Sequence, residues 1–239
     1  MSSQKILITG GAGFIGHHII NKLLNNTNYQ LISLDRLDYS GTYNRIQEII
    51  DNNTLWKKRI KIVWHDLKAE INPMIKKQIG DPEIILHMAA ASHVDRSIKD
   101  PMSFVLDNIV GTTNLLEFAR RNKKLKKFLY FSTDEVFGPA PNNIKYKEND
   151  RYRSGNPYAA TKAGAEELCV AYTNTYKMPI IITHTMNVFG ERQHPEKFIP
   201  KIISSLIKKN EITIHSNKNK TKPGSRFYIH ADDVADAVL

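Results

Sequence analysis

Short apolar runs alternate with amphipathic stretches along this chain of 239 residues. The runs have the length of β-strands and are rich in Ile, Leu, Val or Phe; they cover 6–8, 31–34, 60–64, 84–88, 128–131 and 179–183. The stretches between them carry apolar residues at helical spacing, which predicts helices over 14–24 and, most clearly, over 101–122 and 158–176. Strands that alternate with helices are typical of a parallel sheet covered on both faces. We therefore predict an α/β protein with a doubly wound parallel sheet.

The pattern changes towards the C-terminal end. Residues 216–225 are rich in Asn, Lys and Gly, which predicts a surface loop. Residues 229–239 read as a strand that passes into a helix, and the sequence stops there without a polar tail or a cap. We expect one main domain over 1–186 and a small, truncated C-terminal lobe over 187–239.

Composition narrows the class of protein. A net charge of +10 would suit a nucleic-acid partner, but the basic residues are dispersed and accompany no recognisable binding module, so we expect none. No apolar run approaches the roughly 18 residues of a membrane span, and the N-terminal residues show no secretory signal. The single cysteine, Cys169, falls in a helical pattern and is expected to be buried. We therefore predict a cytoplasmic protein without a membrane partner.

A glycine-rich loop follows the first predicted strand and opens the first predicted helix. Gly10, Gly13 and Gly16 have the spacing of a dinucleotide-binding loop, in which glycines permit a tight turn, a close approach to a pyrophosphate and close helix–sheet packing. Asp35 ends the second strand, where such folds place the acid that binds the adenosine ribose and repels a 2′-phosphate. We therefore predict a Rossmann-like sheet that binds NAD. Arg36 leaves an alternative open, because an arginine there is able to pair with the 2′-phosphate of NADP.

Tyr158 and Lys162 lie four residues apart in a predicted helix and therefore share a face. A lysine ammonium beside a phenol favours the phenolate and lowers the pKa of the tyrosine. Tyr158 would then be a base that accepts a hydroxyl proton while hydride leaves the same carbon, and Lys162 would also hold a ribose. The alternative is an incidental Tyr and Lys on an exposed helix.

Thr133, Asp134 and Glu135 follow the fifth predicted strand, at the edge where open α/β sheets bind ligands. Two neighbouring carboxyl groups push their pKa values apart, which provides one acid and one base. An acid and a base beside a hydride-transfer site suit an elimination. Taken alone, the two acids fit a turn and a cap in a loop just as well.

Together these motifs resemble the extended short-chain dehydrogenase/reductases. The segments that carry the resemblance span almost the whole chain and are 9–16, 35–41, 87–97, 108–112, 132–138, 158–162 and 194–200. Within that family, the run from Thr133 to Glu135 is similar to the triplet of the nucleotide-diphosphate-glucose 4,6-dehydratases, which act on dTDP-glucose or UDP-glucose. Related 4-epimerases have small or hydroxyl residues in place of the two acids, and related decarboxylases have Thr-Ser-Glu.

The resemblance implies an NAD-dependent hydro-lyase that converts a nucleotide-diphosphate glucose to the 4-keto-6-deoxy sugar and water, towards deoxysugars of the rhamnose type. It implies that Tyr158 takes the C4 hydroxyl proton as hydride passes to NAD, and that Thr133 hydrogen-bonds the C4 oxygen. Glu135 would remove the C5 proton and Asp134 would donate a proton to the C6 hydroxyl. Hydride would then return to C6 and regenerate NAD.

The resemblance also implies binding residues. Those for NAD are Gly10, Gly13, Phe14, Ile15, Gly16, Asp35, Arg36, Leu37, Asp38, Asp66, Leu67, Met88, Ala89, Ala90, Tyr158 and Lys162. Those for the nucleotide sugar are Ser92, Thr133, Asn187, Lys197, Phe198, His215 and Arg226. Asp66 suits the adenine amino group or a turn cap. The family further implies a homodimer in which the helices at 101–122 and 158–176 pair across a two-fold axis.

Departures from the family pattern leave the nucleotide base, thymine or uracil, open. Asp107 stands where the bacterial enzymes usually have Thr near the cofactor, and 185–190 and 225–228 also differ. A UDP-sugar 4-epimerase or decarboxylase of the same fold, or a non-catalytic NAD-binding protein, is the alternative function. We predict no metal site, because His17 and His18 lack further ligands at suitable spacing and are expected on the surface of their helix.

Overall fold

The computed structural model describes residues 4–140, 144–214, 216 and 219–239. Its central sheet has six strands in the order β3-β2-β1-β4-β5-β6, all parallel. The strands are β1 (Lys5–Thr9), β2 (Gln30–Asp35), β3 (Ile60–Trp64), β4 (Ile84–His87), β5 (Lys127–Thr133) and β6 (Ile180–Thr185). This is the Rossmann order, which reverses between β1 and β4 and leaves a crevice beyond their carboxyl ends. The predicted fold class is confirmed.

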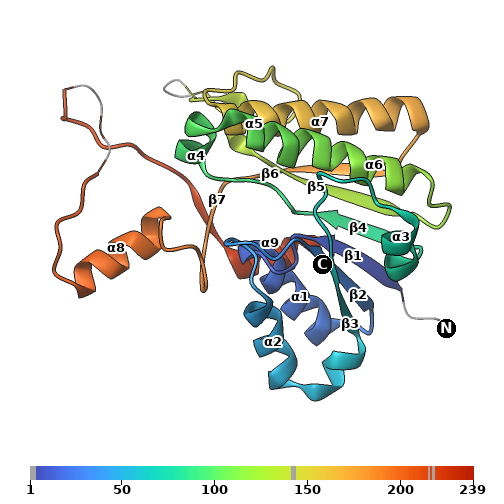
Figure 1. Ribbon diagram of the computed structural model, residues 1–239. Coiled ribbons are helices and arrows are strands. Elements are labelled where there is room, and N and C mark those ends of the chain that lie inside the picture. Colours follow the sequence, from blue (N-terminus) through green and yellow to red (C-terminus); the bar gives the residue numbers. More distant parts are fainter. Residues whose placement is uncertain (1–3, 141–143, 215, 217–218) are drawn as a thin grey trace.

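Helices cover both faces of the sheet (Figure 1). On one face, the sheet shares a buried apolar cluster with α1 (Phe14–Asn26), α2 (Tyr43–Asn52) and α9 (Ala231–Val238). On the other, it shares a second cluster with α3 (Pro73–Ile79), α6 (Gly111–Arg120) and α7 (Pro157–Tyr176), and Cys169 of α7 is buried there. The two clusters explain why the strands read as continuous apolar runs, since both faces are covered. No helix among the described residues combines the length and the apolar character needed to cross a membrane.

The helix predicted over 101–122 is interrupted. After α4 (Val94–Lys99) come α5 (Pro101–Phe104), a π-helical turn, η2 (Val105–Val110), and then α6. Asn108 in η2 is 1% exposed, and its amide donates to the Ala91 carbonyl and to Thr161 and accepts from the Ala91 N–H. These bonds tie η2 to the segment after β4 and to α7, and the π turn holds one residue more than an α-helical turn. π turns inside helices often occur at functional sites.

Other elements connect to this core. η1 (Thr54–Lys58) precedes β3, and η3 (Asp134–Phe137) follows β5. A second, two-stranded parallel sheet pairs β7 (Asn187–Phe189) with β8 (Tyr228–His230). Figure 1 draws α8 (Phe198–Ile207) away from the central sheet, and all its residues are at least partly exposed. Because α9 packs against α1, part of the predicted C-terminal lobe lies on the main sheet; the division at 186 stays a prediction.

His17 and His18 were expected on a helix surface, and that expectation is wrong: both are buried, because α9 covers their face of α1. His18 Nδ1 lies 2.7 Å from Asp232 Oδ1 of α9, and Nε2 lies 3.2 Å from the Glu191 carbonyl oxygen. His18, Glu191 and Asp232 carry ligand-type atoms within 4.8 Å of one another. Both ring nitrogens of His18 are within hydrogen-bonding distance of these protein atoms. The absence of a metal stays a prediction.

Candidate active site

A cavity of about 370 Å³ opens at the carboxyl ends of the parallel strands. Most residues predicted for cofactor, substrate and catalysis line it, namely Gly10, Gly13, Phe14, Ile15, Gly16, Asp35, Arg36, Asp38, Asp66, Leu67, Met88, Ala89, Ala90, Ser92, Thr133, Asp134, Glu135, Tyr158, Lys162, Asn187, Lys197 and Phe198. Of the described residues predicted for binding, Leu37 and Arg226 are not in its lining. Leu37 donates its N–H to Asp35, and the exposed Arg226 guanidinium donates to the carbonyl of Ser225. His215 lies outside the described residues.

The glycine loop has little room for side chains. Gly10 has φ +69°, and a Cβ there would lie 2.8 Å from the backbone nitrogen of Ala89 on the neighbouring strand connection. A Cβ on Gly16 would meet the Gly10 carbonyl oxygen and Gly11 Cα. The glycines therefore let α1 begin directly against the sheet. Gly13 caps α1, and none of the described residues in its first turn is acidic, which suits an anionic pyrophosphate.

Asp35 is fixed at the end of β2. Its carboxylate accepts the N–H of Ala12 at 3.1 Å and the N–H of Leu37 at 2.8 Å. Burial raises the pKa of Asp35, and these two hydrogen bonds oppose the rise. A Cβ on Gly41 would lie 2.8 Å from Asp35 Oδ1, so the loop after β2 closes around the carboxylate without a side chain. The glycine loop at the start of α1 suits the pyrophosphate of an adenosine diphosphate, and Asp35 at the end of the neighbouring strand β2 suits its ribose.

A series of buried hydrogen bonds links the segment after β4, which lines the crevice, to η2. The N–H groups of Met88 and Ala89 donate to Thr9 Oγ1, which lies 2.7 Å from His87 Nδ1. His87 Nε2 lies 2.9 Å from Thr112 Oγ1, and that hydroxyl donates to the Asn108 carbonyl in η2. Burial lowers the pKa of His87 to about 3, and the nearby Lys162 charge acts in the same direction. A neutral His87 that accepts at Nδ1 and donates at Nε2 satisfies every bond in this series.

The acid pair sits in a tight turn. Thr133 caps η3: its Oγ1 accepts the Glu135 N–H at 3.3 Å and donates to Asp134 Oδ1 at 3.3 Å. Gly138 ends the turn with φ +76°, and a Cβ there would collide with the carbonyl oxygen of Arg153. Successive side chains of a strand point to opposite faces, so the turn is what allows both carboxylates to line one cavity.

The first turn of α7 is tied to that acid pair. Asn156 caps α7 by accepting the N–H of Ala159 at 2.9 Å, and its amide nitrogen donates to Glu135 Oε2 at 3.3 Å. The Tyr158 N–H donates to Ser97 Oγ of α4 at 3.1 Å. The turn that carries the phenol is therefore held from both sides.

Tyr158 and Lys162 are both buried, and their proton affinities differ from the sequence expectation. Lys162 Nζ donates to the Phe131 carbonyl at 2.5 Å and lies 4.3 Å from the Tyr130 ring centroid. Burial lowers the pKa of Lys162 to about 8. Burial and then the Glu135 charge raise the pKa of Tyr158, with a smaller rise from Asp134, although a hydrogen bond with Thr133 opposes them. The expected lowering of the Tyr158 pKa by Lys162 is therefore wrong for this structure.

Several residues in or beside the cavity had no assigned role in the sequence pattern. Tyr39 and Glu196 line the cavity. Beside them, the Arg96 guanidinium lies 4.2 Å from the Tyr39 ring centroid and donates to Glu196 at 3.0 Å. His93 Nε2 lies 3.3 Å from the same carboxylate. The signal for these residues was present, because 35–41 and 87–97 carry the family resemblance. Nearby, Lys197 Nζ donates to the Ser92 carbonyl at 3.2 Å; burial lowers the pKa of Lys197, which the Glu135 charge opposes.

Comparison with known proteins identifies the same fold. Residues 6–239 match the NAD dependent epimerase/dehydratase family. A dTDP-D-glucose 4,6-dehydratase of Dictyostelium discoideum is 40% identical over 98% of this chain, which spans 54% of that relative's length. A dTDP-glucose 4,6-dehydratase from Streptomyces venezuelae, solved with NAD bound, superposes with a TM-score of 0.87 at 30% identity, over 98% of this chain and 70% of that one.

A UDP-glucose 4-epimerase from Thermus thermophilus, also solved with NAD, has a TM-score of 0.84 at 28% identity, over 98% of this chain and 73% of that one. The predicted cofactor, NAD, agrees with the family description and with these two structures. The resemblance inferred from the glycine loop, the acid triplet and the Tyr/Lys pair is confirmed: the chain belongs to the NAD dependent epimerase/dehydratase family.

Proposed function

We propose that this protein is a nucleotide-diphosphate-glucose 4,6-dehydratase, a hydro-lyase that forms a 4-keto-6-deoxy sugar nucleotide and water, with NAD as its resident cofactor. One observation carries the proposal: Asp134, Glu135 and Tyr158 line the same cavity as the glycine loop. A 4-epimerase moves a hydride at one carbon and needs neither carboxylate. An elimination needs both an acid and a base beside the hydride site.

The cofactor would lie along the carboxyl edge of the sheet. Gly10, Gly13 and Gly16 with the start of α1 would hold the pyrophosphate, Asp35 the adenosine ribose, and Lys162 the nicotinamide ribose. When bound, NAD supplies a positive charge, accepts hydride from C4 of the sugar and returns hydride to C6. The remaining NAD contacts inferred from the resemblance belong to this same proposal.

The protein's side chains would move the protons. Tyr158 takes the C4 hydroxyl proton as a phenolate, a form that the positive charge of bound NAD would favour, while Thr133 hydrogen-bonds the C4 oxygen. Glu135, oriented by Asn156, removes the proton at C5 once C4 is a ketone, because the carbonyl acidifies the neighbouring C–H. Asp134 donates a proton to the C6 hydroxyl, which leaves as water. A proton returned to C5 completes the product.

Substrate binding would involve both predicted domains. Ser92 and Lys197 lie together at the mouth, and Lys197 suits the diphosphate. Asn187 and Phe198 line the same cavity from 187–239 and would contact the sugar nucleotide.

Exposed apolar residues on α5, η2 and α7, including Met102, Leu106 and Val170, support a homodimer through these helices. We also propose a cytoplasmic location, which stays a prediction.

The test is incubation with NAD and, in separate reactions, dTDP-glucose and UDP-glucose, with products resolved by mass spectrometry. We expect loss of one water from one or both sugars, and the better substrate names the nucleotide base. Bound NAD without turnover of either sugar would instead indicate an NAD-binding protein without this activity.

A UDP-sugar 4-epimerase is the second candidate, because the solved epimerase superposes nearly as well as the dehydratase. Its product has the mass of its substrate and is separated by chromatography as the galactosyl epimer. Formation of that epimer without loss of water would replace the dehydratase assignment.

A further inference from the structure

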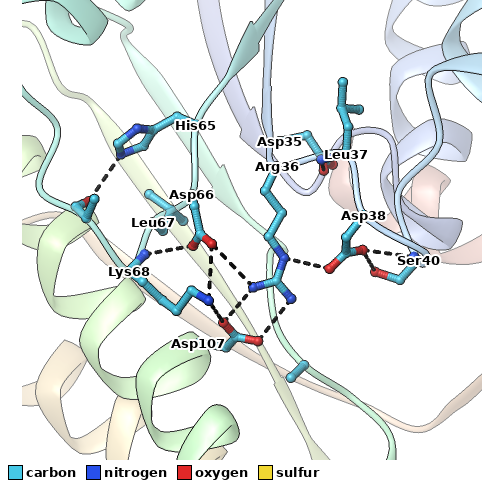
Figure 2. Close-up of polar contacts among 12 residues, drawn as sticks. Asp35, Arg36, Leu37, Asp38, Ser40, His65, Asp66, Leu67, Lys68 and Asp107 are labelled. Atoms are coloured by element: carbon cyan, nitrogen blue, oxygen red, sulfur yellow. Dashed lines mark hydrogen bonds and ion pairs between the residues drawn. The ribbon is translucent and has the colours of Figure 1, made fainter.

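Arg36, the residue that left NADP open as an alternative, is surrounded by carboxylates (Figure 2). Its Nη1 and Nη2 donate to the two oxygens of Asp107 at 2.6 and 3.0 Å, a bidentate pair. Its Nε donates to Asp38 Oδ2 at 2.6 Å, and Asp66 Oδ2 lies 3.8 Å from Nη1. Figure 2 shows the guanidinium between Asp38 on one side and Asp66 and Asp107 on the other.

Both ends of this arrangement are anchored. The backbone of Arg36 is held by Trp64 of β3, whose Nε1 donates to the Arg36 carbonyl at 2.9 Å. Asp107 belongs to η2, and its side chain is only 11% exposed. Asp107 is next to Asn108, whose buried amide fixes the π turn to the Ala91 backbone. The bidentate contact therefore joins two rigid parts of the fold.

The local charge is negative. Among the described residues, the cations near Asp35, Asp38, Asp66 and Asp107 are Arg36, Arg45, which interacts with Asp35, and Lys68, whose Nζ lies 3.3 Å from Asp66 and 4.0 Å from Asp107. Burial opposes the charge of the Arg36 guanidinium, but the hydrogen bonds and charges of Asp107 and Asp38 outweigh it and raise the pKa of Arg36. Four carboxylates against three cations leave an excess of one negative charge where the adenosine ribose would lie.

We propose that Asp107 is a specificity-determining residue, which selects NAD against NADP by holding the Arg36 guanidinium away from the 2′-position of the adenosine ribose. This inference rests on the proposed function, because it requires the cavity to hold NAD. A 2′-phosphate would have to take Arg36 from Asp107, which breaks two charge-assisted hydrogen bonds. It would also leave the Asp107 carboxylate, whose side chain is 11% exposed, with Lys68 at 4.0 Å in place of the bidentate Arg36, beside a dianion. NAD has a hydroxyl at this position and causes neither loss.

The test measures binding rather than turnover. Dissociation constants for NAD and NADP are determined by isothermal titration calorimetry on the wild-type chain and on Asp107→Asn, which keeps the shape of the side chain and removes its charge. The wild type should bind NAD far more tightly. In D107N the preference should fall by about tenfold, the equivalent of one charge-assisted hydrogen bond, mainly through tighter NADP binding.

Two variants distinguish the Asp107–Arg36 contact from a general effect of charge. Asp81→Asn makes the same charge change at an exposed carboxylate that lies 3.9 Å from Lys124, and should leave the preference unchanged. Arg36→Gln combined with D107N should cancel the gain in NADP binding, because the freed guanidinium is what binds the phosphate.

The outcomes discriminate between the claims. If D107N does not fold, R36Q alone tests the inference. Because Asp107 already holds Arg36, loss of Arg36 should not weaken NADP binding relative to NAD binding. A selective weakening of NADP binding in R36Q would overturn the inference. NAD binding with an unchanged preference in folded D107N, or a gain that persists without Arg36, would overturn it too. A wild-type chain that binds neither dinucleotide would overturn the proposed function and this inference with it.

Discussion

Asn156 joins the helix of the phenol to the turn of the acids: its Oδ1 caps α7, and its Nδ2 donates to Glu135 Oε2 at 3.3 Å. Two residues later the same helix carries Tyr158. One amide therefore sets the position of the proposed C5 base relative to the proposed C4 base. Neither bond can shift without disturbing the other, since both come from one side chain.

Replacing that amide by a carboxylate tests its positioning role. Asn156→Asp keeps an oxygen to cap α7 but loses the donor and places a negative charge beside Glu135, so Glu135 should turn away or become protonated. We expect at least about a tenfold loss of kcat, the equivalent of one lost hydrogen bond to a charged group, with little change in Tm or in NAD affinity. The pH profile of kcat should also move to higher pH. The matched control is Asn72→Asp, since Asn72 caps α3 through the same kind of bond to Ile75; equal kcat in the two variants would contradict this role.

The two acids should be separable by isotope exchange. In Asp134→Asn, Glu135 still removes the C5 proton, so deuterium from D₂O should enter C5 of the substrate while loss of water slows by about a hundredfold or more. Absorbance at 340 nm should rise as the reaction stalls after C4 oxidation. Glu135→Gln should block both exchange and elimination. Deuterium entry in E135Q, with none in D134N, would reverse the two assignments.

The phenol of Tyr158 should stay protonated in the cofactor-free protein. Its pKa lies above the ordinary tyrosine value because of burial and of the Glu135 charge, so the neutral form persists when the pH is raised past about 10, where exposed tyrosines ionise. Protein labelled with ¹³C at the tyrosine ζ-carbon, compared with Tyr158→Phe to assign the signal, measures this by NMR. A phenolate signal from Tyr158 near neutral pH would contradict it.

His87 should make folding sensitive to acid. Its pKa is about 3 in the folded chain and about 6.5 when exposed, so below pH 6.5 the unfolded chain binds the additional proton and stability falls until the pH reaches about 3. Between pH 7.5 and 5 this group should remove about 2 kcal/mol. Urea unfolding of the wild type and His87→Gln should show the stability difference between them narrowing by that amount. His17→Gln serves for comparison, because burial and the His18 charge lower the pKa of His17 to about 4.

Local patterns were enough to predict the sheet and the position of the cavity. The strand runs are apolar because both faces of the sheet are covered, and the ends of parallel strands meet at one edge. Gly10, Asp35 and Glu135 were found because each needs only its neighbours in sequence: a turn, a strand end and a cap. These features lie within a few residues of the signals that predict them.

Long-range contacts account for what the sequence did not predict. The π turn depends on Asn108 reaching Ala91, 17 residues away, and Thr161, 53 away. The burial of His18 depends on Asp232, 214 residues away. The pKa of Tyr158 depends on burial and on the turn that carries Glu135, whereas the spacing to Lys162 alone indicated the opposite direction. A local pattern contains none of this information.

The π turn η2 also makes cofactor binding sensitive to the loss of a single residue, although the helix itself would still form. A π turn holds one residue more than an α-helical turn. Deleting one residue from 105–110 would make the helix regular and would leave the helical residues on either side of the turn in register, but it would shift the residues inside the turn. Asp107 or Asn108 would then lose its register with the sheet edge. A one-codon deletion here would therefore change the preference for NAD over NADP while the helix still folds.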